Sequence, residues 1–166
     1  ERGSRLTTRT FGSWVYWPGA ARFDADPYTR AHFARRGELP HSPALAMTFQ
    51  ARIDSDGNRL HSACEYEVAG PDINSVWWSL AVYDDRGTLI PNPAGRHAYN
   101  ANSTLRAANG SFAVVLSREA RPGNWLPTSG AGPIVLVLDV QEPRGGWPAP
   151  GTEIAALPVI KKVACR

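Results

Sequence analysis

Hydrophobic and polar residues alternate along much of this chain, which is the pattern of β-strands that bury one face. The clearest example is the stretch 76–83, VWWSLAVY, where two successive tryptophans place one large ring on each face of an extended strand. We therefore expect the central strand of a sandwich here, with the Trp78 ring in the core against Leu136 or Leu138. The other ring is expected beside a groove, because a large ring on the second face must be covered or used.

The same alternation marks three further stretches, 45–53, 60–68 and 134–140. A tight turn at 54–58 joins the first two, and we expect them to pair as a hairpin. The third predicts an inner strand.

Turn signals follow these stretches at intervals. Asn109-Gly110 is the strongest short hairpin signal. The stretch 121–127, which contains two prolines and a glycine, is expected to be a rigid loop.

One segment predicts a helix. Asp26 can cap the free amides of a first turn that begins at Pro27, and Gly37 can end the helix. A buried stripe on this helix is expected from the side chains spaced three residues apart: Tyr28, Ala31 and Ala34.

The 15 glycines and 14 prolines are spread between apolar runs, as in folds made of many short strands. A length of 166 residues fits one domain. We predict an all-β protein, a jelly-roll-like β-sandwich of about eight strands with one short N-terminal helix. Residues 1–11 are expected to be a flexible lead-in, and residues 12–166 a single β-sandwich domain.

The charge pattern argues against nucleic acid as a partner. The net charge is +3, and the sixteen arginines and two lysines are dispersed among acidic residues. No apolar run approaches the ~18 residues of a membrane-spanning helix. Because the chain opens at Glu1 rather than Met, we expect any export signal or inner-membrane anchor to lie upstream of it.

The two cysteines, Cys64 and Cys165, are not in a metal-ligand spacing. They are either a buried thiol and a loose terminal one, or a disulfide that holds the last strand in an oxidising compartment. We favour the disulfide.

The turn at 54–58 contains the start of a calcium-loop pattern, with Asp54, Asp56, Asn58 and Glu65 at positions 1, 3, 5 and 12. However, the glycine stands at position 4 rather than 6, and strands flank the loop. Turn chemistry accounts for these residues, so we predict no metal and no cofactor.

Several short motifs occur in a fixed order between residues 45 and 163. They are Trp78-Ser79 with Tyr83-Asp84, Asn92-Pro93 before Arg96, Asn109-Gly110-Ser111, Asn124-Trp125-Leu126-Pro127, and Trp147-Pro148. The ordered set resembles the bacterial domain-of-unknown-function family 1214.

The resemblance implies a jelly-roll-like sandwich in the bacterial envelope, secreted or singly anchored, and it brings no established reaction. Longer members carry a companion domain of family 1254, which implies a companion envelope protein of that type as one partner. This chain departs from the family pattern at His97, where Tyr is common. It also has Asp139 and Gln141 where the family often has Arg and Tyr, so a site that uses those two residues is not expected here.

Familiar catalytic motifs are missing from the sequence, and its histidines, His32, His41, His61 and His97, are isolated. What remains is a set of rings, amides and one guanidinium on predicted loops, which suits a glycan-type ligand. We take the tentative ligand site to be Arg96, His97, Asn124 and Trp125. Other members of the set are Tyr99, Asn102 and Trp147.

A structural interpretation of the same residues stays open, in which Asn124 bonds loop backbone and Trp125 plugs the end of the sandwich. Two classes of function follow. The first is a non-catalytic periplasmic module that binds a partner protein or an envelope glycan or lipid-type ligand. The second is a hydrolase or isomerase of unrecognised type, with His97 or Asp139 as acid or base.

Overall fold

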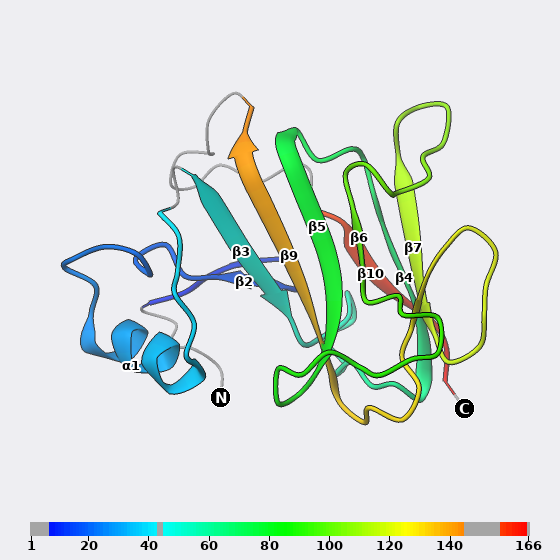
Figure 1. The fold of residues 1–166 in the computed structure, drawn as a ribbon, viewed down its shortest axis with the longest axis horizontal. Coiled ribbons are helices and arrows are strands. Elements are labelled where there is room, and N and C mark those ends of the chain that lie inside the picture. Colours follow the sequence, from blue (N-terminus) through cyan, green and yellow to red (C-terminus); the bar gives the residue numbers. More distant parts are fainter. Residues whose placement is uncertain (1–6, 43–44, 145–156, 166) are drawn as a thin grey trace.

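The structure is a computed structural model, and it describes residues 7–42, 45–144 and 157–165. Within these ranges the chain forms ten strands and one helix, arranged as two sheets (Figure 1). The first sheet has six strands, in the order β1 (Arg9–Phe11), β2 (Trp14–Tyr16), β3 (Ala46–Ala51), β9 (Ile134–Pro143), β5 (Ser75–Asp84) and β6 (Ala98–Asn100). The second has four, in the order β10 (Val159–Cys165), β4 (Cys64–Gly70), β7 (Phe112–Ser117) and β8 (Asn124–Pro127).

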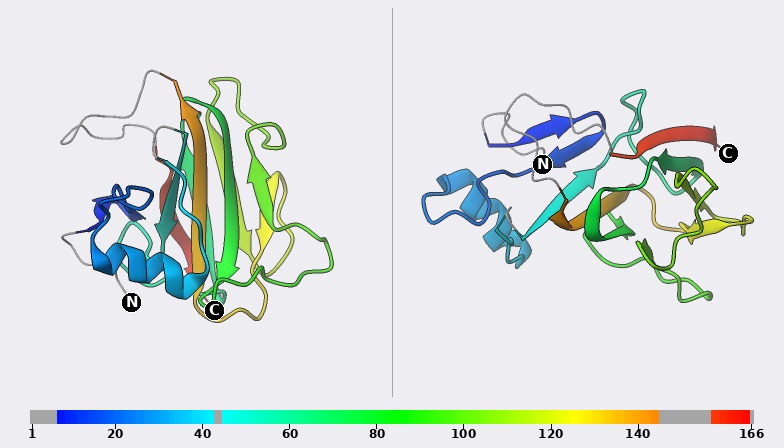
Figure 2. Two further views of the ribbon diagram at one scale, coloured as in Figure 1. Left: turned by 60° about the vertical axis from the view of Figure 1, so that its left-hand side comes forward. Right: turned by 90° about the horizontal axis from the view of Figure 1, so that it is seen from above.

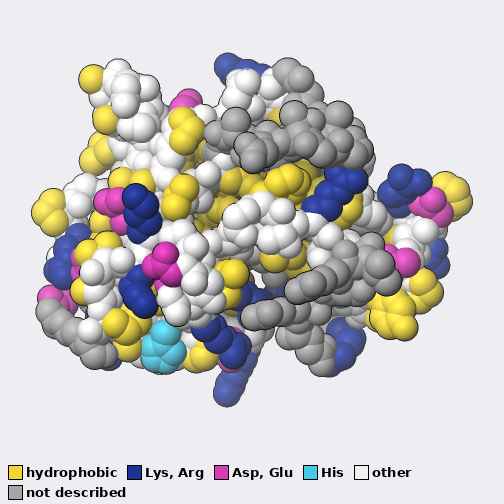
Figure 3. Space-filling model, turned by 180° about the vertical axis from the view of Figure 1, so that it is seen from behind, with side chains coloured by type: hydrophobic (Ala, Val, Ile, Leu, Met, Phe, Trp, Pro, Cys, Tyr) yellow, Lys and Arg dark blue, Asp and Glu magenta, His cyan; other side chains and the backbone are white. Residues whose placement is uncertain are grey.

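The two sheets face each other and enclose one hydrophobic core, which confirms the predicted all-β sandwich (Figure 2). Alternate residues of the strands point into this core, so the apolar positions that recur at every second residue of the sequence are the buried ones. All strand pairs are antiparallel except β7 with β8, which run parallel. Seen from behind, the charged side chains of the described residues are scattered rather than gathered in one patch (Figure 3).

Strand β5 lies inside the six-stranded sheet, between β9 and β6. The Trp78 side chain is 1% exposed, as expected for the core. Its ring stacks on Phe112 of the opposite sheet, with ring centroids 4.8 Å apart, and its partner across the strand pair is Val140. Leu136 and Leu138 are also buried in the core and lie opposite Val82 and Leu80 of β5. The expected core position of Trp78 is therefore confirmed, and its contact with Leu136 or Leu138 stays a prediction.

The predicted hairpin of 45–53 with 60–68 is wrong. The first stretch forms β3 and pairs with β2 and β9, whereas the second forms β4 in the other sheet. Only one isolated bridge, Ile53 with Arg59, links them at the turn. Each stretch buries its own apolar face, so the two pack face to face across the core and are not neighbours in one sheet.

Helix α1 (Pro27–Arg36) begins and ends where the sequence predicts. The Asp26 side chain accepts the backbone N–H groups of Tyr28 and Thr29, and Gly37 takes the left-handed conformation at the C-cap.

The expected buried stripe on the helix is wrong, since Tyr28, Ala31 and Ala34 are all exposed. The helix instead packs through His32, which stacks on Trp17 with ring centroids 4.6 Å apart, and through Phe33. This short helix is polar on most sides and has only a weak hydrophobic face, so the contact with Trp17 decides which side packs against the protein.

Two more expected loops form strands. Residues 9–11, within the expected lead-in, pair with β2 as β1. The expected rigid loop 121–127 ends in β8, because Asn124–Pro127 pairs with β7 as an edge strand. No helix among the described residues is long and apolar enough to cross a membrane.

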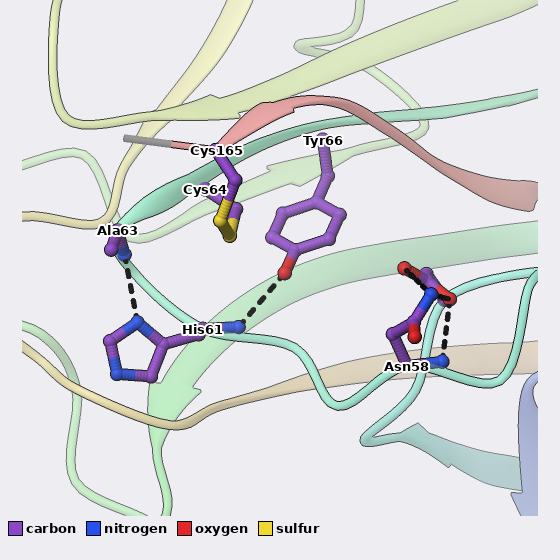
Figure 4. Close-up of a disulfide and its surroundings, with 7 residues drawn as sticks. Asn58, His61, Ala63, Cys64, Tyr66 and Cys165 are labelled. Carbon is purple, nitrogen blue, oxygen red and sulfur yellow. Dashed lines mark hydrogen bonds between the residues drawn. A yellow bond between two sulfur atoms is a disulfide. The ribbon is translucent and has the colours of Figure 1, made fainter.

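The C-terminal strand is tied to its neighbour by a disulfide. Cys165 on β10 lies directly opposite Cys64 on β4, and their sulfur atoms are bonded (Figure 4). Below this bond, the Tyr66 hydroxyl accepts the backbone N–H of His61 at 3.0 Å. The His61 ring accepts the backbone N–H of Ala63 through Nδ1 at 3.1 Å. The structure therefore contains the disulfide that the sequence favours.

Candidate functional site

The structure brings part of the predicted ligand site together. The Arg96 guanidinium carbon lies 5.9 Å from the ring centroid of Trp125 and 5.9 Å from that of Tyr99. His97 lies next in the chain, and its Nδ1 is 3.3 Å from the side-chain amide nitrogen of Asn92. Within the described part of the chain, no carboxylate is hydrogen-bonded or ion-paired to His97. These loops therefore lack the histidine–carboxylate pair that the enzyme hypothesis needs.

The other two predicted residues have structural roles. Asn124 is 5% exposed, and its side chain accepts from the N–H of Leu105 and donates to the carbonyls of Leu105 and Ala113. All three hydrogen bonds are 2.8–2.9 Å long, so both N–H groups and the oxygen of the Asn124 amide hold the backbone.

Trp125 closes the open side of the sandwich between the edge strands β6 and β8. Its indole N–H donates to the Ser117 carbonyl at 3.0 Å, and its backbone N–H donates to the Tyr99 hydroxyl at 3.0 Å. Arg96 covers the two rings from outside. The structural interpretation of Asn124 and Trp125 therefore accounts for their contacts. Of the wider set, Asn102 is exposed, and Trp147 lies outside the described residues.

A second region has the properties of a binding site. The outer face of the six-stranded sheet carries a groove of about 560 Å³, bordered on one side by α1 and the segment that follows it. We call it the outer groove. Figure 1 shows this helix beside the sheet, next to β3, at the side opposite β6. The outer groove is therefore separate from the Arg96–Trp125 cluster.

The floor of the outer groove is built from alternate residues of three adjacent strands. Because β3, β9 and β5 are antiparallel neighbours, residues that point away from the core line up in rows across the sheet. One row is Thr48, Asp139 and Ser79, and another is Ala46, Gln141 and Trp77. The remaining floor residues are Gln50, Val135, Val137 and Tyr83. Polar groups thus lie between two aromatic rings, Trp77 and Tyr83, at the two ends of β5.

Asp139 is the titratable group at the centre of this floor. Burial raises its pKa above the ordinary value, and a hydrogen bond from the Thr48 hydroxyl, 2.5 Å to Oδ1, lowers it by less. Burial also raises the pKa of Tyr83, and the charge of Asp139 adds to that rise. The outer groove therefore offers a carboxyl that keeps its proton to a higher pH than a surface aspartate.

The walls come from the N-terminal part of the chain. Tyr16 is the last residue of β2 and Trp17 comes directly after it, whereas Phe33 and Arg36 belong to α1. The Trp17 ring is fixed between the stacked His32 ring and the edge of Phe33. Burial lowers the pKa of His32, so the ring that holds this wall favours its neutral form.

Reasoning from the sequence alone misses the outer groove, apart from its expectation of a ring beside a groove at Trp77. A sequence signal for this face does exist in 134–141. Val135 and Val137 alternate there with the core residues, and Asp139 and Gln141 follow on the same face. A polar residue on the second face of an inner strand indicates a face that is not wholly covered. What the sequence could not give was the adjacency of β3, β9 and β5.

The calcium-loop residues are engaged by the protein itself. The Asp54 carboxylate accepts the backbone N–H groups of Asp56 and Asn58, at 3.0 and 2.8 Å. Glu65 instead faces Arg121, with 2.7 Å between Oε2 and Nη2, and accepts from the Ser117 hydroxyl. Among the described residues no group of three or more histidine, cysteine or acidic side chains could hold a metal ion.

Comparison with known families gives one match. The model of the family described as "Protein of unknown function (DUF1214)" matches residues 45–145, which is more than half of the chain. The chain belongs to the DUF1214 family. No curated protein matches it.

Two solved structures are similar to this DUF1214 chain. The VPA0106 protein of Vibrio parahaemolyticus is 21% identical, with a TM-score of 0.66 over 84% of this chain and 36% of that one. An uncharacterized protein from Burkholderia cenocepacia is 21% identical, with a TM-score of 0.48 over 87% of this chain and 45% of that one. The likeness to the Vibrio protein supports a shared fold. This chain spans less than half the length of either.

The DUF1214 match divides the outer groove into two parts. All three floor strands, β3, β5 and β9, lie within residues 45–145, whereas β2 and α1, which supply the walls, precede that range. Asp139 and Gln141 of β9 both lie on the floor. The floor of the outer groove therefore lies within the matched range, and the walls from β2 and α1 lie outside it.

Proposed function

We propose that this DUF1214 protein is a non-catalytic module of the bacterial periplasm that binds a small envelope glycan in the outer groove. The observation that carries the proposal is the floor itself, where hydrogen-bonding side chains lie between the rings of Trp77 and Tyr83. Aromatic rings pack on the apolar faces of sugars, and hydroxyl, amide and carboxyl groups bond sugar hydroxyls.

The size of the outer groove favours a small ligand over a protein partner. A volume of about 560 Å³ lies within the range of about 300–1,000 Å³ that is usual for small-molecule sites. A protein interface is commonly flatter and buries about 800 Å² on each partner. A companion envelope protein of the family 1254 type would then bind elsewhere on the sandwich, and the glycan would be held independently of it.

The periplasmic setting is supported by the disulfide between Cys64 and Cys165. Disulfides form and persist in oxidising compartments, of which the bacterial periplasm is one. The family resemblance points to the same compartment.

The proposal is tested by calorimetric titration with a neutral disaccharide of N-acetylglucosamine. Trp77→Ala is expected to weaken binding at least about fivefold, since stacking on one ring is worth about 1 kcal/mol or more. The matched control is Arg96→Ala, which removes a side chain from the other aromatic cluster and should leave the dissociation constant unchanged. Weaker binding in Arg96→Ala together with unchanged binding in Trp77→Ala would move the site to the Arg96–Trp125 cluster.

A second candidate function rests on Asp139. A half-buried carboxyl with a raised pKa in a groove is a candidate general acid. The alternative function, a hydrolase or isomerase, would therefore depend on Asp139. This candidate predicts hydrolysis of a 4-nitrophenyl glycoside of N-acetylglucosamine by the wild type and its loss in Asp139→Asn. The binding module predicts no turnover by either protein.

A further inference from the structure

One end of the outer groove carries a cation, Arg52, that has no partner among the described residues. Arg52 comes directly after β3 and is half-buried, and its side chain lines the groove. Within the described part of the chain, the Arg52 guanidinium makes no hydrogen bond and no ion pair. Guanidinium groups that are partly removed from water are usually paired, because their desolvation is otherwise uncompensated.

The charges around Arg52 add to this cost. Burial lowers the pKa of Arg52, and the positive charges of Arg36 and Arg59 lower it further. Asp85 and Glu38 act in the opposite direction with smaller effects. An anion bound at this end of the groove would therefore offset the effects that lower the pKa of Arg52.

Arg36 brings a second guanidinium to the same end from a different element. It belongs to the last turn of α1, and its Nε is 2.5 Å from Glu38 Oε1. Its Nη2 lies beside Gly87, 3.6 Å from the point where a Cβ would stand. Arg36 thus reaches from the wall towards the turn after β5. An anion between the wall and the floor would meet cations from both sides.

We propose that this end of the outer groove is an oxyanion subsite, in which Arg52, assisted by Arg36, holds a carboxylate or phosphate group of the bound glycan. The planar guanidinium of arginine presents paired N–H donors that match the two oxygens of such a group. The subsite rests on the proposed function, because it occupies one end of the same groove. It adds that the ligand is acidic.

The spacing sets a lower limit on the ligand. Arg52 is four residues beyond Thr48, which places it roughly 13 Å further along the sheet. A ligand that contacts both the Asp139 row and Arg52 therefore needs at least two sugar rings, with its acidic group at one end.

The test compares three probes on the whole chain by calorimetric titration. One is the neutral disaccharide of N-acetylglucosamine, and the second is the matching disaccharide whose terminal ring carries the lactyl carboxylate of N-acetylmuramic acid. The third is the neutral disaccharide with a phosphate on its terminal ring, which separates the two sources of the anion. The wild type should bind at least one acidic probe about tenfold or more tighter than the neutral one, and added salt should reduce that difference.

The decisive variant is Arg52→Gln, with Arg59→Gln as the matched control. Arg59 is an exposed arginine in the same field that does not line the outer groove. Because the Arg52 side chain makes no hydrogen bond or ion pair with the described residues, its replacement should keep the melting temperature and the affinity for the neutral probe. It should remove the preference for the acidic probe, whereas Arg59→Gln should keep that preference.

Equal loss of preference in the two variants would overturn the subsite, because it would show a diffuse charge effect. Equal affinity of the wild type for the acidic and neutral probes would overturn the subsite while leaving the proposed function standing. Binding of none of the three probes would overturn the proposed function and the subsite together.

Discussion

Trp78 provides the sharpest test of the packing, because its ring carries both a large contact and an unsatisfied polar atom. The side chain is 1% exposed and stacks on Phe112 across the two sheets, at an interplanar angle of 26°. Its indole Nε1 is buried and has no hydrogen-bond partner in the part of the chain that the structure describes. Trp78→Ala therefore removes the ring and the orphaned N–H at once, whereas Trp78→Phe removes the N–H and keeps a ring against Phe112.

The magnitudes follow from these two contributions. Truncation of a core tryptophan to alanine costs about 3–5 kcal/mol of unfolding free energy. Relief of a buried, unpaired N–H returns about 1 kcal/mol or more. We expect a net loss of roughly 3 kcal/mol for Trp78→Ala, which lowers the melting temperature by about 6–12 °C in a chain of this size. Trp78→Phe should stay within about 1 kcal/mol of the wild type, because a smaller cavity and the removed N–H offset each other.

The assay is urea denaturation with the disulfide intact, followed by far-ultraviolet circular dichroism so that the signal does not depend on the altered ring. A Trp78→Ala variant within about 1 kcal/mol of the wild type would refute the central place of this ring in the core. A Trp78→Phe variant as unstable as Trp78→Ala would show that the indole N–H does have a partner.

Three further predictions concern other parts of the fold. Replacing Cys64 and Cys165 together by serine should lower the unfolding free energy by up to about 4–5 kcal/mol in the chain-entropy account, measured by denaturation under non-reducing conditions; an unchanged midpoint would contradict it. Asn124→Ala should cost about 3 kcal/mol, at about 1 kcal/mol for each of its three hydrogen bonds, with a thermal melt as the measurement; a melt that matches the wild type would rule out the structural role. Because burial raises the pKa of Asp139 in the folded state, the folded chain binds this proton more tightly, and wild-type stability should fall as pH rises from the ordinary value of 3.8 through the raised pKa. Asp139→Asn removes this slope, so its stability relative to the wild type should increase between pH 4 and pH 7 in denaturant titrations, and a decrease would contradict the burial argument.

Local features of the fold could be predicted from the sequence because they depend on neighbours in the chain. The helix bounds follow from Asp26, Pro27 and Gly37, whose effects act within one turn. The burial of Trp78 follows from alternation along one strand. The pairing of 45–53 with 60–68 was predicted wrongly, since alternation shows which face is buried but not which strand lies beside it.

The candidate site shows the same limit more strongly. Arg96 and Trp125 do meet, yet Trp125 and Asn124 are engaged in closing the sandwich. Thr48, Asp139 and Ser79 form the floor of the outer groove, although 91 residues separate Thr48 from Asp139 along the chain. Only the strand order brings such residues together, and the strand order depends on long-range packing that a single sequence does not state.

The position of β9 between β3 and β5 has a consequence for the order of events during synthesis. The strand that joins β3 to β5 is residues 134–143, which are made after both of these neighbours. Until the ribosome releases this segment, β3 and β5 have no common partner, and each exposes a hydrogen-bonding edge. The two halves of the larger sheet can therefore join only after residues 134–143 have been made, and this pairing of strands far apart in the sequence is expected to be slow.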